Sequence, residues 1–372
     1  MPSPSRPRPA LLLGASVVSL VLGGCGDPPS AATPSKAGEA ETKTEAKAEA
    51  ETADTKSGRG PKPTLKPSPH LPTLRDGDPK KAEEALALMI GGRHDIPLPP
   101  ELEGILHDRI SQGHVWAAQD LLLVGGIDAV DKAMAATKDD AIVTALANSI
   151  GLRFRLARDQ VDADEPTRSA KVLLSKLGTT ADPHPLLAAL RDIGPKAGDV
   201  ARTPVAALLA NPKTRWEAAS TLTSLGAGEE VETLFAHLGD EDREVRIAVA
   251  QAIGCSGRPV SERLQQSLSD ENDRVKESAI RALAHLGPKA AGAVEPLTAL
   301  LDHSNVELVN HSAHTLGAIG TAASSALPAL TKAAAAAKTR GPTGDVDLQI
   351  AISSVKGEVQ RPSSCPYPVD AP

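Results

Sequence analysis

The sequence predicts an all-α protein: an α-solenoid, a superhelix of stacked helical hairpins, that follows a disordered N-terminal tether. Ala and Leu are abundant, and aromatic residues make up only 1% of the chain. Ala and Leu favour helices, whereas sheets favour β-branched and aromatic residues. A 13-residue pattern with helical spacing also recurs along the chain. The apolar fraction of 41% is enough to bury a core between stacked helices.

Residues 1–24 have the organisation of a secretory signal peptide. Arg6 and Arg8 make the start basic, and Ala10 to Leu22 form an apolar stretch that is shorter than the roughly 20 residues a spanning helix needs. The stretch ends in Leu22, Gly23, Gly24 and Cys25. This ending resembles the lipobox of bacterial lipoproteins, in which an apolar residue and two small residues precede the modified cysteine. The alternative is an ordinary signal peptide with a cysteine there by chance.

The lipobox resemblance implies cleavage before Cys25, a diacylglyceryl thioether on its sulfur and acylation of the new amino terminus. Several acyl chains anchor a protein firmly, whereas one chain alone binds a membrane only marginally. We therefore expect a lipid-anchored protein of the bacterial cell envelope. Gly26 follows the cysteine, and because the family's retention signal is an aspartate there, the outer membrane is favoured over the inner one.

Residues 25–78 are predicted to form the lipidated cysteine and its tether. The segment is rich in Pro, Ala, Thr, Glu and Lys, which cannot bury a core. About 50 such residues span roughly 40 Å as a coil. The tether would lift the folded part off the membrane, or it would be a linker of no particular length.

The recurring pattern reads DREVRIAVAQAIG at Asp242–Gly254, and close copies occupy Asp139–Gly151 and Asp345–Gly357. Its first residue is polar and predicts a helix cap, and its last is a glycine that can end the helix with positive φ. Positions 4, 7, 8 and 12 are apolar or small and share one helix face. In the first copy these are Val245, Ala248, Val249 and Ile253.

A second helix, often with a proline near its start, is predicted between successive copies. The copies recur at roughly 30 residues, a period typical of helical-hairpin repeats. We expect irregular helical repeats over 79–181, a regular array over 182–357 and a C-terminal tail over 358–372. Trp116 and Trp216 occupy the fourth position of their copies and are expected to pack in the core.

The pattern resembles the HEAT repeat, in the short form related to the repeats of phycobilin lyases. The resemblance is carried by the segments from Asp240 to Arg246 and from Asp270 to Lys276. In that family an Asp in the turn and an Arg or Lys six residues later form a ladder between neighbouring repeats. The resemblance therefore implies ladder pairs of Asp240 with Arg246 and of Asp270 with Lys276.

In the resembled family the helix that ends each repeat, which here is the helix of the 13-residue copy, lines the concave side of the superhelix. The residues expected to face outward there are polar and of mixed charge, with few aromatic residues, which favours a weak and extended contact. The candidate concave binding surface consists of Arg246, Gln251, Glu277, Arg281, His285, Asn310, His311 and His314, with Ala250 beside them.

The sequence carries no motif that predicts catalysis. It has no Gly-rich phosphate loop, no Gly-x-Ser-x-Gly elbow and no His-Glu-x-x-His pair. His311 and His314, near His303 and His285, could offer nitrogens to a metal, but a solvated polar face is the favoured interpretation. We therefore expect no catalytic residues, no cofactor and no metal site.

Cys255 and Cys365 leave two possibilities open. They could form a disulfide, but two unpaired thiols are the favoured prediction, because nothing in the sequence places Cys365 near the end of the helix that Cys255 follows.

The predicted function is a membrane-anchored, non-enzymatic scaffold that binds a protein partner on the concave face of the solenoid. The net charge of −7 and the lack of a basic run argue against nucleic acid as the partner. The alternatives are a purely structural spacer in the envelope or an enzyme on a HEAT-like fold, such as a lyase. The sequence does not indicate the partner or the oligomeric state.

Overall fold

The computed structural model describes residues 70–90, 98–156, 161–338, 345–359 and 365. The predicted signal peptide, the lipobox, Cys25 and nearly all of the tether lie outside the described residues. Within the described ranges all regular secondary structure is helical, which confirms the predicted all-α class. None of these helices combines the length and the apolar character needed to cross a bilayer.

The α-helices are α1 (Leu71–Asp76), α2 (Pro79–Ile90), α3 (Leu102–Ser111), α4 (Val115–Ala136), α5 (Asp140–Leu156), α6 (Glu165–Leu177), α7 (His184–Ile193), α8 (Gly198–Ala207), α9 (Arg215–Leu225), α10 (Val231–Phe235), α11 (Arg243–Gly254), α12 (Ser261–Ser267), α13 (Asp273–Leu286), α14 (Val294–Ala299), α15 (Val306–Ile319), α16 (Leu327–Lys338) and α17 (Val346–Val355). Short 3-10 helices precede or follow several of them: η2 (Gly194–Ala197), η3 (Leu208–Ala210), η4 (Gly228–Glu230), η5 (Gly287–Ala293), η6 (Leu300–Asp302) and η7 (Gly320–Ala326).

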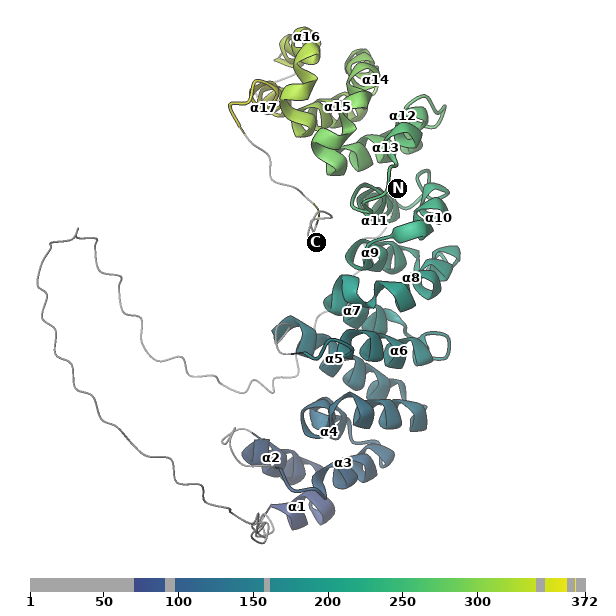
Figure 1. The fold of residues 1–372 in the computed structure, drawn as a ribbon, viewed down its shortest axis with the longest axis vertical. Coiled ribbons are helices and arrows are strands. Elements are labelled where there is room, and N and C mark those ends of the chain that lie inside the picture. The colour runs from purple at the N-terminus through teal and green to yellow at the C-terminus, as the bar shows by residue number, and fades with distance from the viewer. Residues whose placement is uncertain (1–69, 91–97, 157–160, 339–344, 360–364, 366–372) are drawn as a thin grey trace, which may run out of the picture.

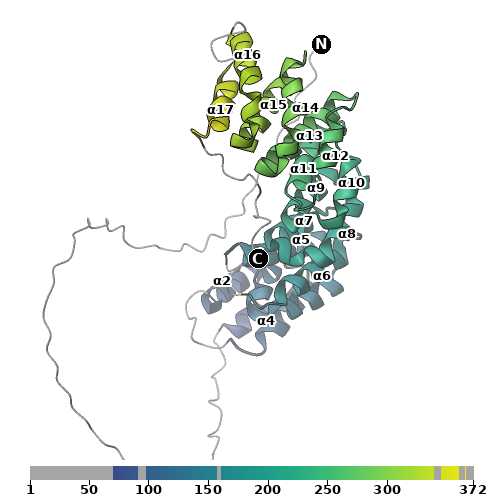
Figure 2. The same cartoon turned by 45° about the horizontal axis from the view of Figure 1, so that its top comes forward.

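The helices stack in two rows along a curved arc (Figure 1). α5, α7, α9, α11, α13, α15 and α17 form the inner row, on the concave side, and each packs against the next. α6, α8, α10, α12 and α14 form the outer row, and both rows remain distinct when the molecule is turned (Figure 2). This is the predicted solenoid, and the 13-residue copies form its inner row.

Three inner helices, α11, α13 and α15, begin as the repeated pattern predicts, whereas Asp345 makes no side-chain capping bond at the start of α17. The side chains of Asp242, Asn272 and Asn305 each accept a hydrogen bond from the backbone N–H two residues further on. These bonds satisfy donors that the first turn of a helix leaves without a partner. The four apolar positions predicted for the copy at Asp242 are all buried.

The closing glycines of the copies play two different roles. Gly194 and Gly226 have positive φ and end their helices as predicted. Gly151 and Gly254 instead lie inside or at the end of helical backbone, so the prediction of a positive φ was wrong for them. A Cβ on Gly254 would lie 2.5 Å from the carbonyl oxygen of Ala282, so this glycine allows α13 to approach α11 closely.

Two features of the N-terminal half differ from simple hairpins with a loop. α4 contains Gly126 with φ 65°, so it consists of two helices joined at one residue. α1 lies within the segment predicted to be a disordered tether, and that prediction was wrong for residues 71–76. The reason is long-range packing: Leu74 is fully buried, and Arg109 on α3 donates to the carbonyl oxygens of Leu74 (2.8 Å) and Gly77 (2.7 Å).

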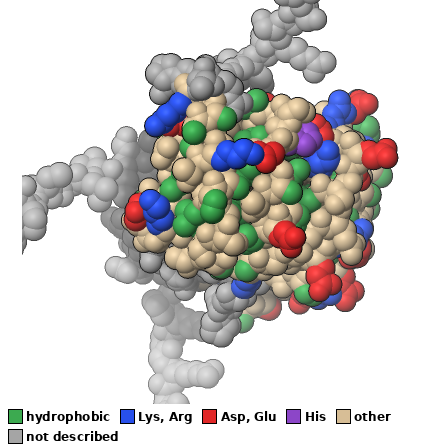
Figure 3. Space-filling view, turned by 90° about the horizontal axis from the view of Figure 1, so that it is seen from above, with side chains coloured by type: hydrophobic (Ala, Val, Ile, Leu, Met, Phe, Trp, Pro, Cys, Tyr) green, Lys and Arg blue, Asp and Glu red, His purple; other side chains and the backbone are tan. Residues whose placement is uncertain are grey.

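A single buried apolar cluster runs through the stack from α1 to α17. Trp116 is buried in it and Trp216 packs against it partly buried, in agreement with the packing role predicted for both. At the C-terminal end of the array, seen in Figure 3, hydrophobic side chains lie at the surface between scattered charges of both signs. Exposed apolar residues of this end are Val346, Ile350 and Val359.

Cys255 and Cys365 form a disulfide, and the favoured prediction of two free thiols was wrong. Cys255 is the residue that follows α11, and the sulfur of Cys365 lies 3.9 Å from the carbonyl oxygen of His285 at the end of α13. Cys365 therefore lies at the C-terminal ends of α11 and α13, although it follows α17 in the sequence. Sequence spacing alone does not reveal this proximity.

Candidate binding surface

A groove of about 880 Å³ lies on the concave side, across α11, α13, α15 and α17. It brings together five residues of the predicted surface from two helices: Arg281 and His285 on α13, and Asn310, His311 and His314 on α15. Its remaining lining residues are Arg243, Ile247, Ala284, Glu307, Thr315, Ala318, Asp347 and Ile350.

Three of the residues expected to face outward are buried. Arg246 is 8% exposed, Glu277 is 8% exposed and Ala250 is fully buried. The side chain of Arg246 points toward the turn that precedes α11, where its Nη1 donates to the carbonyl oxygens of Asp240 (3.0 Å) and Glu241 (3.2 Å). The predicted exposure was therefore wrong for these three. Arg246 and Glu277 bond to the turn and to each other rather than to solvent, and Ala250 packs in the apolar core. Gln251 is half-buried and does not line this groove.

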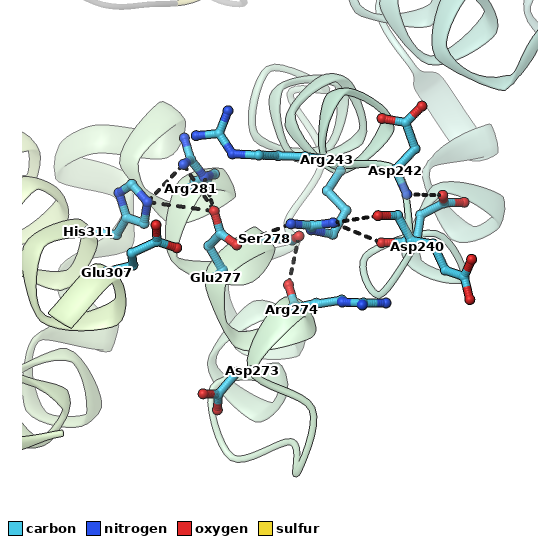
Figure 4. A network of polar contacts seen from close by, with 12 residues as sticks. Asp240, Asp242, Arg243, Asp273, Arg274, Glu277, Ser278, Arg281, Glu307 and His311 are labelled. Atoms are coloured by element: carbon cyan, nitrogen blue, oxygen red, sulfur yellow. Dashed lines mark hydrogen bonds and ion pairs between the residues drawn. The ribbon is translucent and has the colours of Figure 1, made fainter. Parts of the chain in front are cut away.

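Beneath the groove a polar network joins three successive inner helices (Figure 4). Glu277 on α13 accepts from Arg246 Nη2 of α11 at 3.4 Å and from Arg281 Nε at 3.1 Å. Arg281 Nη2 in turn lies 2.7 Å from His311 Nε2 of α15. The network therefore fixes the side chain of Arg281 from below, while Arg281 and His311 also line the groove.

Two hydroxyl groups add bonds between the same repeats. Ser278 Oγ donates to the carbonyl oxygen of Leu238 (2.7 Å), and Thr315 Oγ1 donates to the carbonyl oxygen of Ile280 (3.0 Å). Both hydroxyls are buried, where an unpaired polar group would be costly. These contacts tie neighbouring repeats in a fixed register under the groove.

The electrostatic setting keeps Glu277 charged and the rings of His285 and His311 neutral. Burial opposes ionisation of Glu277, but the hydrogen bond from Arg281 and the charges of Arg281, Arg246 and His311 outweigh it and lower its pKa. Burial, followed by the charge of Arg281, lowers the pKa of His311. Burial and the neighbouring His314 and Arg281 lower the pKa of His285. At neutral pH both rings are therefore uncharged and can donate and accept hydrogen bonds.

The charged side chains on the groove are balanced in sign. Arg243 and Arg281 are met by Glu307 and Asp347. Apolar side chains, Ile247 and Ile350 among them, lie between these charges. The surface can thus offer hydrogen bonds, ion pairs of either sign and apolar contact, and it has no excess of charge that would select one simple ion.

Sequence reasoning missed Arg243, Ile247, Glu307, Asp347 and Ile350 as groove residues. A signal for most of them was present. Positions 3, 6 and 10 of the 13-residue pattern lie on one helix face, and the groove residues Glu307, Ile350 and His314 hold these positions. What the sequence does not contain is the curvature that brings this face of four helices together.

The predicted ladder is present in altered form, at a second hollow of about 800 Å³ lined by Asp240 and Asp270. Arg246 binds the backbone of Asp240, while the carboxylate of Asp240 pairs with Arg215 of the preceding repeat. Burial disfavours ionisation of Asp240, but the Asp242 N–H and Arg215 outweigh it and lower its pKa.

The second predicted rung was wrong in its partners. Lys276 Nζ donates to Asp273 at 2.8 Å rather than to Asp270. The carboxylate of Asp270 accepts from the backbone N–H of Asn272, also at 2.8 Å. Asp270 therefore shapes its own turn, because the backbone N–H two residues further on is a near donor for its short side chain.

The histidines expected to lie on a polar face have partners within the fold. His303 Nδ1 accepts from the backbone N–H of Asn305 at 3.1 Å. His311 is engaged with Arg281, so it does not form a free pair of nitrogens with His314.

Comparison with known families gives a match over the C-terminal half. A model of HEAT repeats matches residues 201–265 and 260–341, a range that includes the groove up to α15. A comparison with curated proteins found no match.

Solved structures with similar helix stacking include an engineered protein, with 18% identity, 77% of this chain and 87% of that chain covered, and a TM-score of 0.43. The archaeal HEAT-like repeats protein from Thermococcus onnurineus has 11% identity, covers 71% of this chain and 99% of that chain, and has a TM-score of 0.36. Kap121p bound to Pho4p has 11% identity, 76% and 41% coverage and a TM-score of 0.44. At these identities and scores the likenesses carry no information about a partner.

Proposed function

We propose that this chain, a HEAT-repeat protein over residues 201–341, is a non-enzymatic scaffold that binds a partner protein in the groove across α11, α13, α15 and α17. The observation that supports this most is the polar network below the groove. A side chain held in place before binding loses less conformational entropy when a partner arrives. Arg281 is held in this way by Glu277.

The composition of the groove supports a protein segment as the ligand. Its volume of about 880 Å³ and its open position along four helices suit an extended chain. The balanced charges and the apolar side chains between them match a segment that carries both polar and apolar residues. Arginine is also among the residues that contribute most to protein interfaces.

The scaffold would act at a membrane of the bacterial cell envelope, the outer one in a cell that has two. The sequence that supports this is the signal-like segment followed by Leu22, Gly23, Gly24 and Cys25. Changing Cys25 to Ser should release the protein from the membrane fraction, because no acyl chain can be attached to a serine oxygen by this route. Continued membrane association of that variant would contradict the anchor, and the mass of the mature N-terminus would identify the acyl groups directly.

The binding proposal is tested with a photo-crosslinking residue placed in the intact chain in its own cells. It replaces His314, which is exposed in the groove, or Glu262, which is exposed on α12 of the outer row. We expect one recurrent protein partner from position 314 and not from position 262. In a binding measurement with that purified partner, Asn310→Arg should then weaken binding by at least tenfold, and Glu262→Arg should leave it unchanged.

The alternatives lead to different outcomes of the same test. A purely structural spacer would give no recurrent partner from either position. An enzyme such as a lyase would give a small-molecule ligand, and Asn310→Arg would then abolish turnover of that ligand instead of partner binding. Either result would overturn the scaffold proposal.

A further inference from the structure

Three side chains that commonly bind metals meet beside the groove. They are Cys255 at the end of α11, His285 in the last turn of α13 and Cys365 in the tail. Each can place one ligand atom so that all three atoms lie within 4.8 Å of one another. The three residues come from distant parts of the chain, so the tertiary fold and not a local sequence motif creates the cluster.

In the structure the two sulfur atoms are joined as a disulfide. A disulfide sulfur is a poor metal ligand, because the thiolate is the form that coordinates. The oxidised chain therefore has a cross-link at this position, and a metal site becomes available only when the disulfide is reduced.

We propose that the reduced cluster binds a zinc ion through Cys255 Sγ, Cys365 Sγ and a ring nitrogen of His285. Thiolate and imidazole are the ligands that Zn²⁺ prefers, in tetrahedral geometry with Zn–S near 2.3 Å and Zn–N near 2.0 Å. Two such Zn–S bonds place the sulfurs about 3.8 Å apart. The two sulfurs must therefore move apart when the disulfide is replaced by the metal. Cys255 is fixed at a helix end, so Cys365 in the tail would move.

The surroundings of His285 favour coordination over charge. The ring is half-buried, and burial together with His314 and Arg281 lowers its pKa. A metal ligand must be the neutral imidazole, so no proton has to be displaced from His285 at neutral pH. Three protein ligands leave the fourth tetrahedral position open to water or another ligand, and His285 also lines the groove.

The change of state balances with a dithiol reductant and Zn²⁺ as the added reactants. A dithiol reductant attacks the Cys255–Cys365 bond, supplies two electrons and two protons, and becomes a disulfide itself. Zn²⁺ then displaces the two protons from the thiols and bonds to both sulfurs. In either state the tail stays attached to the end of α11, by a covalent bond when oxidised and through the metal when reduced. This inference goes beyond the proposed scaffold function and does not depend on it.

The test uses the full-length chain in detergent with Co²⁺ as the spectroscopic substitute for Zn²⁺. Every protein carries Cys25→Ser, so that the N-terminal thiol cannot contribute. We expect the reduced chain to develop a thiolate-to-cobalt charge-transfer band that saturates at one metal per chain and disappears when Zn²⁺ is added. The oxidised chain should show no band.

Variants assign the ligands. Cys255→Ser should remove most of the charge-transfer band, and His285→Ala should weaken Co²⁺ binding at least tenfold, since even loss of an outer partner of a metal ligand costs 10- to 100-fold. His184→Ala, on α7 and remote from the cluster, is the matched control and should change nothing. Circular dichroism confirms that each variant keeps its helices. Reduced chain that binds no Co²⁺, or binding unchanged in both Cys255→Ser and His285→Ala, would overturn the proposal.

Discussion

At the scale of single residues, Glu277 is the shared partner of two arginines. Its carboxylate joins Arg246 of α11 to Arg281 of its own helix, and the side chains of Glu277 and Arg246 are only 10% exposed. In such a place a charge without its partner is costly, whereas the intact pair contributes little net stability. The role of Glu277 is therefore to fix where the two guanidinium groups lie.

Glu277→Gln should lower the free energy of unfolding by roughly 3 kcal/mol, the lower end of the cost of breaking a buried ion pair. The lower end applies because Arg246 keeps its bonds to the carbonyl oxygens of Asp240 and Glu241. The thermal unfolding midpoint measures the effect. Glu262→Gln on the exposed outer row is the control and should stay within about 0.5 kcal/mol of the parent. Equal midpoints for the two variants would show that the network carries no stability.

His285 and His311 predict a loss of stability in weak acid. Folding lowers the pKa of His285 and of His311 below the ordinary value of 6.5. The unfolded chain therefore binds more protons as pH falls below 6.5, so the stability is present above this pH and is lost as pH falls toward the folded pKa values. The charged and titratable groups that face these rings are Arg281, His314, Glu277 and Glu307.

We expect the thermal midpoint to fall between pH 7.5 and pH 5.5, before most carboxylates titrate. The double variant His285→Gln, His311→Gln should show a flatter dependence over this range. His184→Gln, at a half-exposed position on α7, serves as the comparison. An identical slope in the double variant and in the parent would mean that other groups dominate.

At the scale of elements, the spacing between inner helices depends on small residues at their contacts. Gly254 is the clearest case, because a Cβ there would meet the carbonyl oxygen of Ala282 at 2.5 Å. Backbone atoms of a packed helix cannot yield as a flexible side chain can. α11 and α13 would have to move apart to accept any larger residue.

Gly254→Ala should therefore destabilise the protein by about 1–3 kcal/mol, the usual cost of overpacking. Gly104 provides the matched control. It lies inside α3, and a Cβ added there would meet nothing within 4 Å, so Gly104→Ala should stabilise by about 0.5–1 kcal/mol through helix propensity alone. Chemical denaturation of both variants measures the change in the free energy of unfolding, which should be negative for Gly254→Ala and positive for Gly104→Ala. Stabilisation by both would show that α11 and α13 are not in tight contact at Gly254.

The first helix depends on one side chain from another element. Arg109 is 7% exposed and binds the carbonyl oxygens of Leu74 and Gly77. A helix of six residues cannot persist alone, so Arg109→Ala should free residues 71–77 without unfolding the array. Limited proteolysis detects this as new cleavage before α2. Arg75→Ala, an exposed change on the same helix, should leave the cleavage pattern unchanged.

The sequence predicted well whatever follows from local pattern. The caps at Asp242 and Asn272 and the apolar face of α11 follow from short-range chemistry, and so does the order of the hairpins. It predicted poorly what depends on the turn of the superhelix. Three features of this kind link different repeats or the tail. Arg246 is buried against Glu277 of the next repeat, Asp240 pairs with Arg215 of the preceding repeat, and Cys365 of the tail bonds to Cys255. A spacing rule within one repeat cannot predict which residues of different repeats come into contact.

At the scale of the whole molecule, stability is shared between neighbours. Each inner helix contacts the next along the arc, and the described core is continuous from α1 to α17. In such an array a change is felt mainly by adjacent repeats, since each unit contacts only those beside it. The disulfide is the exception, because it closes a loop across a sequence separation of 110 residues.

This loop leads to a regional prediction for the reduced chain. A disulfide stabilises mainly by restricting the unfolded ensemble, typically by about 2–4 kcal/mol. The residues inside the loop are those from α12 to α17, so reduction should speed amide hydrogen exchange there and leave α3 to α9 as protected as before. Hydrogen exchange measured by mass spectrometry on oxidised and reduced chain, with metal chelated, gives the comparison. The double variant Cys255→Ser, Cys365→Ser should match the reduced parent. Uniform loss of protection along the whole chain would show that the array unfolds as one cooperative unit, contrary to the nearest-neighbour account of its stability.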